Sequence, residues 1–283
     1  MSVQMGKYSG FCFGVARAVK LLEKSLDSGI KTYCIGEMIH NPVFNENAKK
    51  RGLIIISEDE IDSIEEGSNV IIRSHGIRLQ LENLLKDKNC NVIDATCFDV
   101  KKIHKIVYEN TSEQSLLIII GNPKHPEVIA TKSYSKGHSV VFEDYSKISA
   151  NLNNNLISSY KDVIMVAQTT HSVSDYEKCK KNLKKVYTNA KIFDTICNVT
   201  EVRQCEADKL SKECDAMLVV GGKTSSNTLK LYDICKVNCD ETFFVETVND
   251  IPALKNELKI GIVAGASTPN DLIEEVMNKC QNN

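Results

Sequence analysis

VIDATCFDVKKIHKIVYENTSEQSLLIIIGNPKHPE, residues 92–127, contains a short strand, a helix and a second strand, and it decides the fold. Val100, Ile103 and Val107 recur at the spacing of one helix face. The run LLIII at 116–120 lacks polar alternation, which is typical of a strand buried on both faces of a parallel sheet. The stretch therefore predicts one αβ unit with a cysteine between its first strand and its helix.

This unit occurs three times along the chain. Cys12, Cys97 and Cys197 are the three cysteines that have a glycine 24 residues later, and each of these glycines ends an apolar run. Four residues beyond the glycine comes a polar residue, which is His40, His125 or Ser225. If the three copies surround one axis, their cysteines and their polar turns converge on a single centre.

Short β-branched runs alternate with amphipathic helical stretches throughout, as in parallel sheets that are covered by helices. We expect an α/β fold of three similar αβ domains with mostly parallel sheets in a pseudo-threefold, or trefoil, arrangement. The domain limits follow the cysteines and give the ranges 1–96, 97–196 and 197–283. The strand before Cys12 has no preceding copy to join, so we expect it to pair with the third domain.

The composition is that of an ordinary globular chain, and it excludes several functions. The 283 residues are 42% hydrophobic and 25% charged, with a formal net charge of −2 and no basic block. Such a chain has no cluster of basic residues that could bind the phosphate backbone of a nucleic acid, so we expect no nucleic-acid partner. The N-terminus lacks a secretory signal, and the longest apolar run, LLIII, is too short to cross a bilayer. We therefore expect a cytoplasmic protein without a membrane partner.

The cysteine pattern predicts a metal centre. The chain has 11 cysteines and no CxxC pair, which disfavours a disulfide framework and a zinc ribbon. A helix N-terminus lowers the pKa of a thiol and favours the thiolate that ligates a metal. Zinc on three thiolates is one option. A redox-active iron–sulfur cluster is the better match, and because such clusters usually take four cysteines, three would leave one iron open.

Polar turns follow the strands in each copy and predict a binding site for an anion. Backbone N–H groups at helix N-termini, together with imidazole and hydroxyl donors, bind anions with little need for lysine or arginine. We expect His40, His75 and His125 to contact the ligand, because they occupy related positions in repeated units. Hydroxyl residues such as Thr169 and Ser267 stand at further strand ends, where open α/β sheets bind ligands.

Glu127 stands two residues beyond His125 and has two interpretations. A poorly solvated carboxyl beside a metal-bound hydroxyl would be a natural proton donor. A glutamate in the first turn of a helix also complements the helix dipole, which is a common structural use. Its position alone does not decide between the two.

Together these motifs resemble the LytB family of 4-hydroxy-3-methylbut-2-enyl diphosphate reductases, which belong to the methylerythritol phosphate isoprenoid pathway. The resemblance runs from FCFGV at 11–15 to AGASTP at 264–269 and includes GEMIHNP, RSHG, DATCF, GNPKHPE, QTT and SSN, with Arg203–Gln204 after the third cysteine. Many members have a Thr-Asn pair before this Arg-Gln, whereas the present chain has Glu201 and Val202. So many ordered motifs at the spacing of one family are highly specific.

The resemblance implies a 4Fe–4S cluster on Cys12, Cys97 and Cys197 at the centre of the trefoil, with the fourth iron open to substrate. It implies that Glu127 and Thr169 are catalytic, with Glu127 as the proton donor. The implied diphosphate pocket consists of His40, His75, His125, Ser225, Ser226, Asn227 and Ser267. The implied reaction is reductive dehydroxylation of an allylic diphosphate to isopentenyl and dimethylallyl diphosphates. Its electrons would come from a donor such as flavodoxin or ferredoxin.

Two alternatives stay open at this point. A quinolinate-synthase-like dehydratase has the same trefoil architecture and a three-cysteine cluster, but the RSHG, HPE and SSN motifs favour the reductase. A binding protein could instead hold zinc on the three cysteines and a phosphorylated metabolite in the turns, without turnover.

Overall fold

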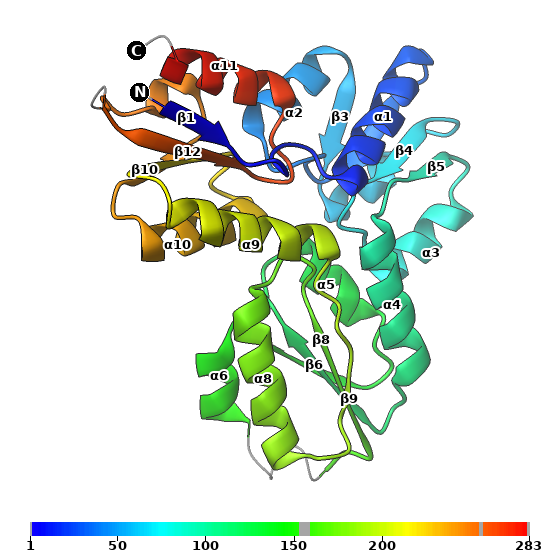
Figure 1. Ribbon diagram of the computed structural model, residues 1–283. Helices are drawn as coiled ribbons and strands as arrows, with labels where there is room; N and C mark the ends of the chain where they lie inside the picture. The colour runs from blue at the N-terminus through cyan, green and yellow to red at the C-terminus, as the bar shows by residue number, and fades with distance from the viewer. Residues whose placement is uncertain (1, 153–158, 255–256, 282–283) are drawn as a thin grey trace. The chain divides into compact units, whose positions relative to one another are not determined.

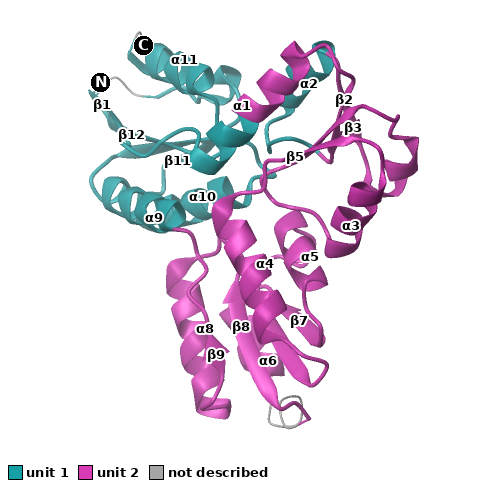
Figure 2. Cartoon of the chain, turned by 90° about the vertical axis from the view of Figure 1, so that its right-hand side faces the viewer, with its two compact units in different colours: residues 1–19, 37–51, 198–283 teal, residues 20–36, 52–197 magenta. Residues whose placement is uncertain are grey.

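A computed structural model describes residues 2–152, 159–254 and 257–281 (Figure 1). The chain divides into two compact units, which Figure 2 shows in different colours. Unit 1 comprises residues 1–19, 37–51 and 198–283, and unit 2 comprises residues 20–36 and 52–197. One boundary falls within α1 (Phe13–Asp27), so this helix contributes to both units.

Unit 1 is built on a four-stranded parallel sheet whose strands come from both ends of the sequence. The sheet has the order β1-β12-β10-β11, with the bounds Ser2–Met5, Lys259–Ala264, Ala216–Val220 and Thr242–Val245. β1 pairs with β12 in parallel and places Met5 opposite Ile262. The predicted pairing of the strand before Cys12 with the third domain is therefore confirmed.

Helices cover both faces of this sheet. Leu218 of β10 belongs to a core cluster that includes residues of α11 (Asn270–Gln281). Met217, its neighbour in the chain, belongs to a second cluster with residues of α9 (Asn198–Ser211) and α10 (Ser226–Asn238). Figure 1 shows α11 on one side of the sheet and α9 and α10 on the other. Both faces of β10 are thus buried, as its unbroken apolar run predicts.

Unit 2 contains two four-stranded parallel sheets. The first has the order β3-β2-β4-β5, with the bounds Leu53–Ile56, Thr32–Ile35, Asn69–Ile72 and Asn91–Asp94. Its apolar cluster includes residues of η1 (Glu58–Ser63) and α3 (Leu79–Asp87). The last part of α1 is joined to this sheet by Ser25 Oγ, which lies 2.9 Å from Thr32 Oγ1 and accepts a hydrogen bond from Asn69 Nδ2 at 2.9 Å.

The second sheet of unit 2 contains the apolar run at 116–120, whereas β5, at the start of the stretch 92–127, belongs to the first sheet. It has the order β7-β6-β8-β9, with the bounds His138–Phe142, Ser115–Ile120, Asp162–Ala167 and Lys191–Ile192. Every residue of β6 is buried. Alternate β6 residues cluster with α6 (Tyr145–Asn151) and α8 (Val173–Val186) on one face. Leu117 and Ile119 cluster with α4 (Phe98–Asn110) and α5 (Pro126–Ser133), so the helix and the buried strand predicted within 92–127 are confirmed.

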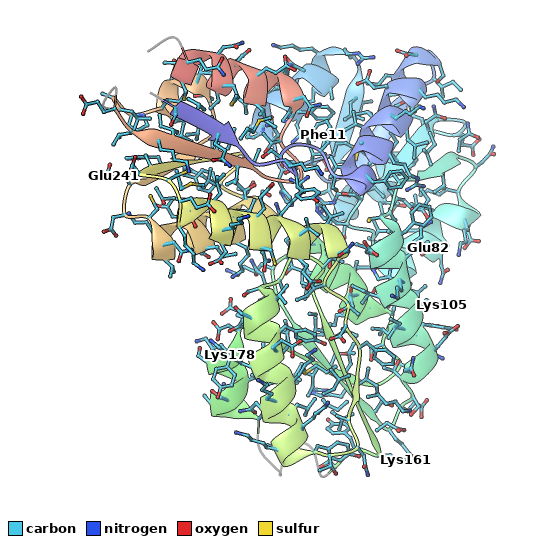
Figure 3. The ribbon with its side chains drawn as sticks, viewed as in Figure 1. Phe11, Glu82, Lys105, Lys161, Lys178 and Glu241 are labelled. Carbon is cyan, nitrogen blue, oxygen red and sulfur yellow. The ribbon has the colours of Figure 1, made fainter. Side chains whose placement is uncertain are left out.

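Two hydrogen bonds join the helices of these two sheets. The amide of Leu79, at the start of α3, donates to Ser133 Oγ of α5 at 2.9 Å. The hydroxyl of Tyr134 donates to Glu82 Oε2 of α3 at 2.7 Å, and Glu82 is labelled in Figure 3. Unit 2 is therefore one compact body that contains the sheets of two repeats.

The predicted α/β class is confirmed, because each of the three repeats forms a parallel sheet with covering helices. Every strand except β1 joins the sheet of its own predicted range. The units do not correspond to single repeats, because residues 1–19 and 37–51 belong to unit 1 and the rest of the first range to unit 2. The limits 1–96, 97–196 and 197–283 therefore stay a prediction. The remaining short elements of unit 1 are α2 (Pro42–Lys50) and η2 (Val248–Asp250).

A matched pair of glycine substitutions tests the packing of the second sheet. A Cβ on Gly137 would lie 2.4 Å from the carbonyl oxygens of Ser112 and Ser115, whereas a Cβ on Gly29 would meet nothing within 4 Å. We expect Gly137→Ala to lower the free energy of unfolding by about 3 kcal/mol through this clash. Gly29→Ala should cost only about 1 kcal/mol, because its φ of +70° is strained for a side chain. Urea unfolding followed by circular dichroism measures both free energies of unfolding. If the two variants lost the same amount, the clash at Gly137 would be contradicted.

Candidate active site

Each of the three repeated cysteines immediately precedes a helix. Cys12 comes directly before α1 and Cys197 directly before α9, while Cys97 is the N-cap of α4. All three side chains are partly exposed thiols. The prediction that each cysteine lies between a strand and the start of a helix is confirmed.

The backbone anchors the three cysteines in the same way. In each copy the cysteine amide donates to the carbonyl oxygen of the second residue beyond a neighbouring strand: Cys12 to Ala266 at 3.1 Å, Cys97 to Ser74 at 3.0 Å and Cys197 to Thr169 at 3.1 Å. These strands are β12, β4 and β8, which pair with the strands that lead to the cysteines. Each thiol is therefore held beside a polar turn of the adjacent strand.

The N-terminus of α10, in unit 1, provides donors for an anion. Ser225 is the N-cap, and its Oγ accepts a hydrogen bond from the amide of Thr228 at 3.3 Å. Ser226 and Asn227 form the first turn. Within the described residues, the buried Nδ2 of Asn227 has no hydrogen-bond partner. An unpaired buried donor at a helix N-terminus fits the binding of an anion.

Two other turns of unit 1 lie against this helix start. Ser267 Oγ donates to Ser225 Oγ at 3.5 Å. A Cβ on Gly222 would lie 2.4 Å from the carbonyl oxygen of His40, so the backbone at 222 can approach the His40 turn only because it lacks a side chain. His40 directly precedes Asn41, the N-cap of α2. The structure thus brings the turns of Ser225, Ser267 and His40 together.

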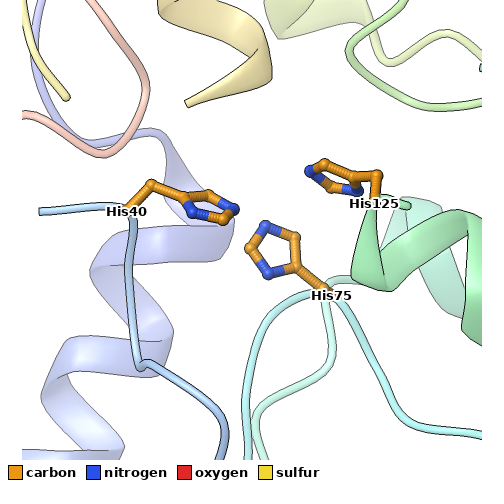
Figure 4. A group of neighbouring side chains, drawn as sticks. All are labelled: His40, His75 and His125. Carbon is orange, nitrogen blue, oxygen red and sulfur yellow. The ribbon is translucent and has the colours of Figure 1, made fainter. Parts of the chain in front are cut away.

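His75 and His125 pack against each other in unit 2. Their ring centroids are 5.1 Å apart and the rings are nearly perpendicular, at 84° (Figure 4). His125 is the N-cap of α5, and its Nδ1 accepts a hydrogen bond from the amide of Glu127 at 3.2 Å. Because Nδ1 is the acceptor, the neutral ring carries its proton on Nε2, from which it can donate to a ligand.

Glu127 is a buried carboxyl that receives two short hydrogen bonds from one residue. It is 2% exposed, and Oε1 accepts from the amide of Thr169 while Oε2 accepts from the hydroxyl of Thr169, both at 2.6 Å. Burial raises the pKa of Glu127 to about 7, although the hydrogen bonds from Thr169 lower it. A carboxyl with this pKa keeps its proton near neutral pH and can still release it. This favours the proton donor over the dipole interpretation.

Thr169 connects this carboxyl with a cysteine. Its amide and hydroxyl bind Glu127, and its carbonyl oxygen accepts the amide of Cys197. The proposed proton donor and one candidate metal ligand are therefore held by a single residue of unit 2.

The candidate residues divide between the units. Unit 1 holds Cys12, His40, Ser225, Ser226, Asn227 and Ser267. Unit 2 holds Cys97, Cys197, His75, His125, Glu127 and Thr169.

Gln168 has a part in the site that its sequence context does not indicate. This side chain is 3% exposed; its Oε1 accepts from the amide of Asn122 at 3.1 Å and its Nε2 donates to Thr170 Oγ1 at 3.0 Å. It thereby ties the turn that leads to His125 to the turn that contains Thr169. The QTT motif contains Gln168, but a neutral amide at a strand end has no chemistry of its own to single it out.

The comparisons with known proteins agree with one another. A family model described as LytB protein matches residues 3–281. The 4-hydroxy-3-methylbut-2-enyl diphosphate reductase of Thermoanaerobacter sp. (strain X514) is 38% identical over 283 residues, which cover 99% of this chain and 96% of that protein. Among the described residues, no helix has both the length and the apolar character needed to span a membrane.

Two solved structures match as well. A structure of (E)-4-hydroxy-3-methyl-but-2-enyl diphosphate reductase, described as the terminal enzyme of the non-mevalonate pathway, has a TM-score of 0.70 and 38% identity and covers 100% of both chains. The E-1-hydroxy-2-methyl-but-2-enyl-4-diphosphate reductase of Plasmodium falciparum has a TM-score of 0.86 and 29% identity, with 98% of this chain and 87% of that chain covered. With a family model along almost its whole length and relatives that share its fold, this chain belongs to the LytB protein family.

Proposed function

We propose that this chain catalyses the reductive dehydroxylation of 4-hydroxy-3-methylbut-2-enyl diphosphate to isopentenyl and dimethylallyl diphosphates, the last step of the methylerythritol phosphate isoprenoid pathway. As an oxidoreductase it would consume two electrons and two protons: the C–O bond breaks, one proton leaves with the hydroxyl as water, and the other is added to carbon. Membership of the LytB family supports this reaction over a quinolinate-synthase-like dehydration or zinc-stabilised metabolite binding. The observation that carries it is the buried Glu127, bound by the residue that anchors Cys197.

The cysteine donors fit an iron–sulfur cluster. Among the residues that the structure describes, no cysteine forms a disulfide, and the three repeated thiols all lie at helix starts. Cys12, Cys97 and Cys197 would hold a 4Fe–4S cluster whose fourth iron has no protein ligand. When bound, such a cluster supplies electrons and a Lewis acid for the substrate hydroxyl. Flavodoxin or ferredoxin is the proposed electron donor.

Glu127 would supply the proton that leaves with the hydroxyl. Its pKa of about 7 keeps the carboxyl protonated up to neutral pH. The hydroxyl of Thr169 contacts Oε2 of Glu127 and can both donate and accept hydrogen bonds. Thr169 can therefore accept a proton from Glu127 and donate its own hydroxyl proton toward the substrate. After this transfer it is a neutral hydroxyl again.

The polar turns would bind the diphosphate. The unpaired Nδ2 of Asn227, the Nε2–H of His125 and the start of α10 are donors that suit its oxygens. Fixed donors of this kind would hold the substrate in place while its other end reacts. The proposed contacts are His40, His75, His125, Ser225, Ser226, Asn227 and Ser267.

One experiment tests the reaction as a whole. The protein is purified anaerobically, its iron content and visible absorption are recorded, and reduced viologen is supplied with the hydroxy-diphosphate. We expect a brown protein that oxidises viologen only when substrate is present and forms both products. A colourless protein without iron would contradict the cluster, and a cluster without reductase turnover would point to the dehydratase.

Glu127→Gln tests the proton donor, because glutamine keeps the shape of the side chain but has no acidic proton. We expect turnover to fall by about 100-fold or more, with iron content and substrate affinity retained. Wild-type turnover should decline as the pH rises above about 7, since the raised pKa means that Glu127 loses its proton there. The control is Glu113→Gln, an exposed glutamate of the same unit. Near-normal activity of Glu127→Gln would exclude this role.

Cys97→Ser tests the cluster ligands, because a serine hydroxyl binds iron far less well than a thiolate does. We expect the variant to lose most of its iron and visible absorption, with its fold retained by circular dichroism. Cys205→Ser is the matched control, since Cys205 is exposed on α9 and belongs to no proposed site. Equal iron contents in the two variants would show that Cys97 is not a ligand.

A further inference from the structure

The turn that carries Cys12 is the longest of the three cysteine turns. Residues 6–11 lie between β1 and Cys12, whereas the corresponding segments before Cys97 and Cys197 are 95–96 and 193–196. A longer segment outside the sheet has more backbone groups to pair and more conformational freedom to lose. Its backbone bonds to β12 and to the turn after it lie at its two ends, where the amide of Gly6 donates to the carbonyl oxygen of Ile262 at 2.8 Å and the amide of Cys12 donates to that of Ala266. Between them, Ser9 Oγ accepts the amide of Ala264 at 3.1 Å, and the other attachments come from α9.

Arg203 of α9 supplies one attachment. The side chain is 5% exposed, its Nη1 donates to the carbonyl oxygen of Ala264 at 2.9 Å, and its Nη2 donates to that of Gly10 at 2.6 Å. Gly10 stands two residues before Cys12, and Ala264 stands three residues before Ser267. One guanidinium thus fixes the turn of a proposed cluster ligand against the turn of a proposed substrate ligand.

Glu206, one helical turn further along α9, supplies another attachment to the same segment. Its carboxylate accepts the amide of Lys7 at 2.6 Å and the amide of Tyr8 at 3.1 Å. α9 therefore holds residues 7–10 at two points. The Arg203 cation binds the carbonyl oxygen of Gly10, and the Glu206 carboxylate binds the two amides. The two amides and the carbonyl oxygen that α9 holds are each matched by a charge of the correct sign.

The arginine is specific to the third copy of the repeat. It lies six residues beyond Cys197, and the residues six beyond Cys12 and Cys97 are Ala18 and Ile103, both buried apolar side chains. The packing of the repeat therefore does not call for an arginine at this position. Lysine could not replace it either, because only the planar guanidinium presents two nitrogens to two carbonyl oxygens at once.

We propose that Arg203 is a positioning residue for the Cys12 thiol, which it holds in place through Gly10 and the end of β12. The importance of Cys12 rests on the proposed function, but the positioning itself can be measured on protein without a cluster. Loss of the two charged hydrogen bonds should let the 6–12 segment open more often, while the turns of unit 2 keep their own anchors.

Arg203→Lys tests this on cluster-free protein kept reduced and anaerobic. The rate at which iodoacetamide alkylates each cysteine is read by peptide mass spectrometry. We expect Cys12 to react about tenfold faster than in the wild type, with Cys97 unchanged as the internal reference. Amide hydrogen exchange of a peptide that spans residues 6–12 should accelerate by a similar factor. Lys209→Met, at an exposed lysine of the same helix, is the control and should change neither rate.

On cluster-loaded protein, Arg203→Lys should release iron to a chelator faster than the wild type, while the decline of turnover above pH 7 stays in place. The proposal would be overturned if Cys12 alkylation and the exchange of residues 6–12 in Arg203→Lys were as slow as in the wild type. If that variant does not fold, Arg203→Gln, which removes the charge and one of the two donor groups, takes its place, and unchanged rates there would overturn the proposal as well. If the wild-type protein held no cluster, the proposed function would be contradicted. The rates of Cys12 alkylation in wild type and Arg203→Lys would still decide the role of Arg203.

Discussion

Parallel strand pairing is the constraint on which the rest of this structure depends. All strands of a parallel sheet point the same way, so the turns that follow them lie along one edge. In each sheet the strand that leads to a cysteine is paired with a strand that leads to a polar turn, and one amide–carbonyl bond joins the two turns. The backbone alone therefore places each thiol beside polar donors, and the side chains then decide what chemistry results.

Much of the fold could be predicted from local pattern. The run at 116–120 is apolar without alternation, so a strand with both faces covered is the structure that suits it, and β6 is such a strand. The partner of β1 could also be predicted, because the first copy has no earlier sheet to join. What could not be predicted is that the sheets of two repeats belong to one compact unit, since this depends on contacts such as the one between Tyr134 and Glu82.

The candidate site was less predictable, because its decisive contacts join distant parts of the chain. Glu127 suits the first turn of a helix equally well as a dipole partner, and only burial and the bonds from Thr169, 42 residues away, favour a proton donor. One pKa unit corresponds to about 1.4 kcal/mol, so ionising this carboxyl at its buried position costs on the order of 3 kcal/mol more than in water. Arg203 donates a hydrogen bond to Gly10, which is 193 residues away, and no local sequence pattern indicates such a contact.

The pairing of β1 with β12 also sets an order of events during synthesis. Residues 2–12 are made early, yet the strand that β1 pairs with and the carbonyl oxygen that anchors Cys12 are made late. The strands of unit 2 all lie between residues 32 and 192, so its two sheets can form while the ribosome is still extending the chain. Cys97 and Cys197 can therefore be in place before Cys12 is. Of the three, the first cysteine to be translated is the last whose anchoring carbonyl is made.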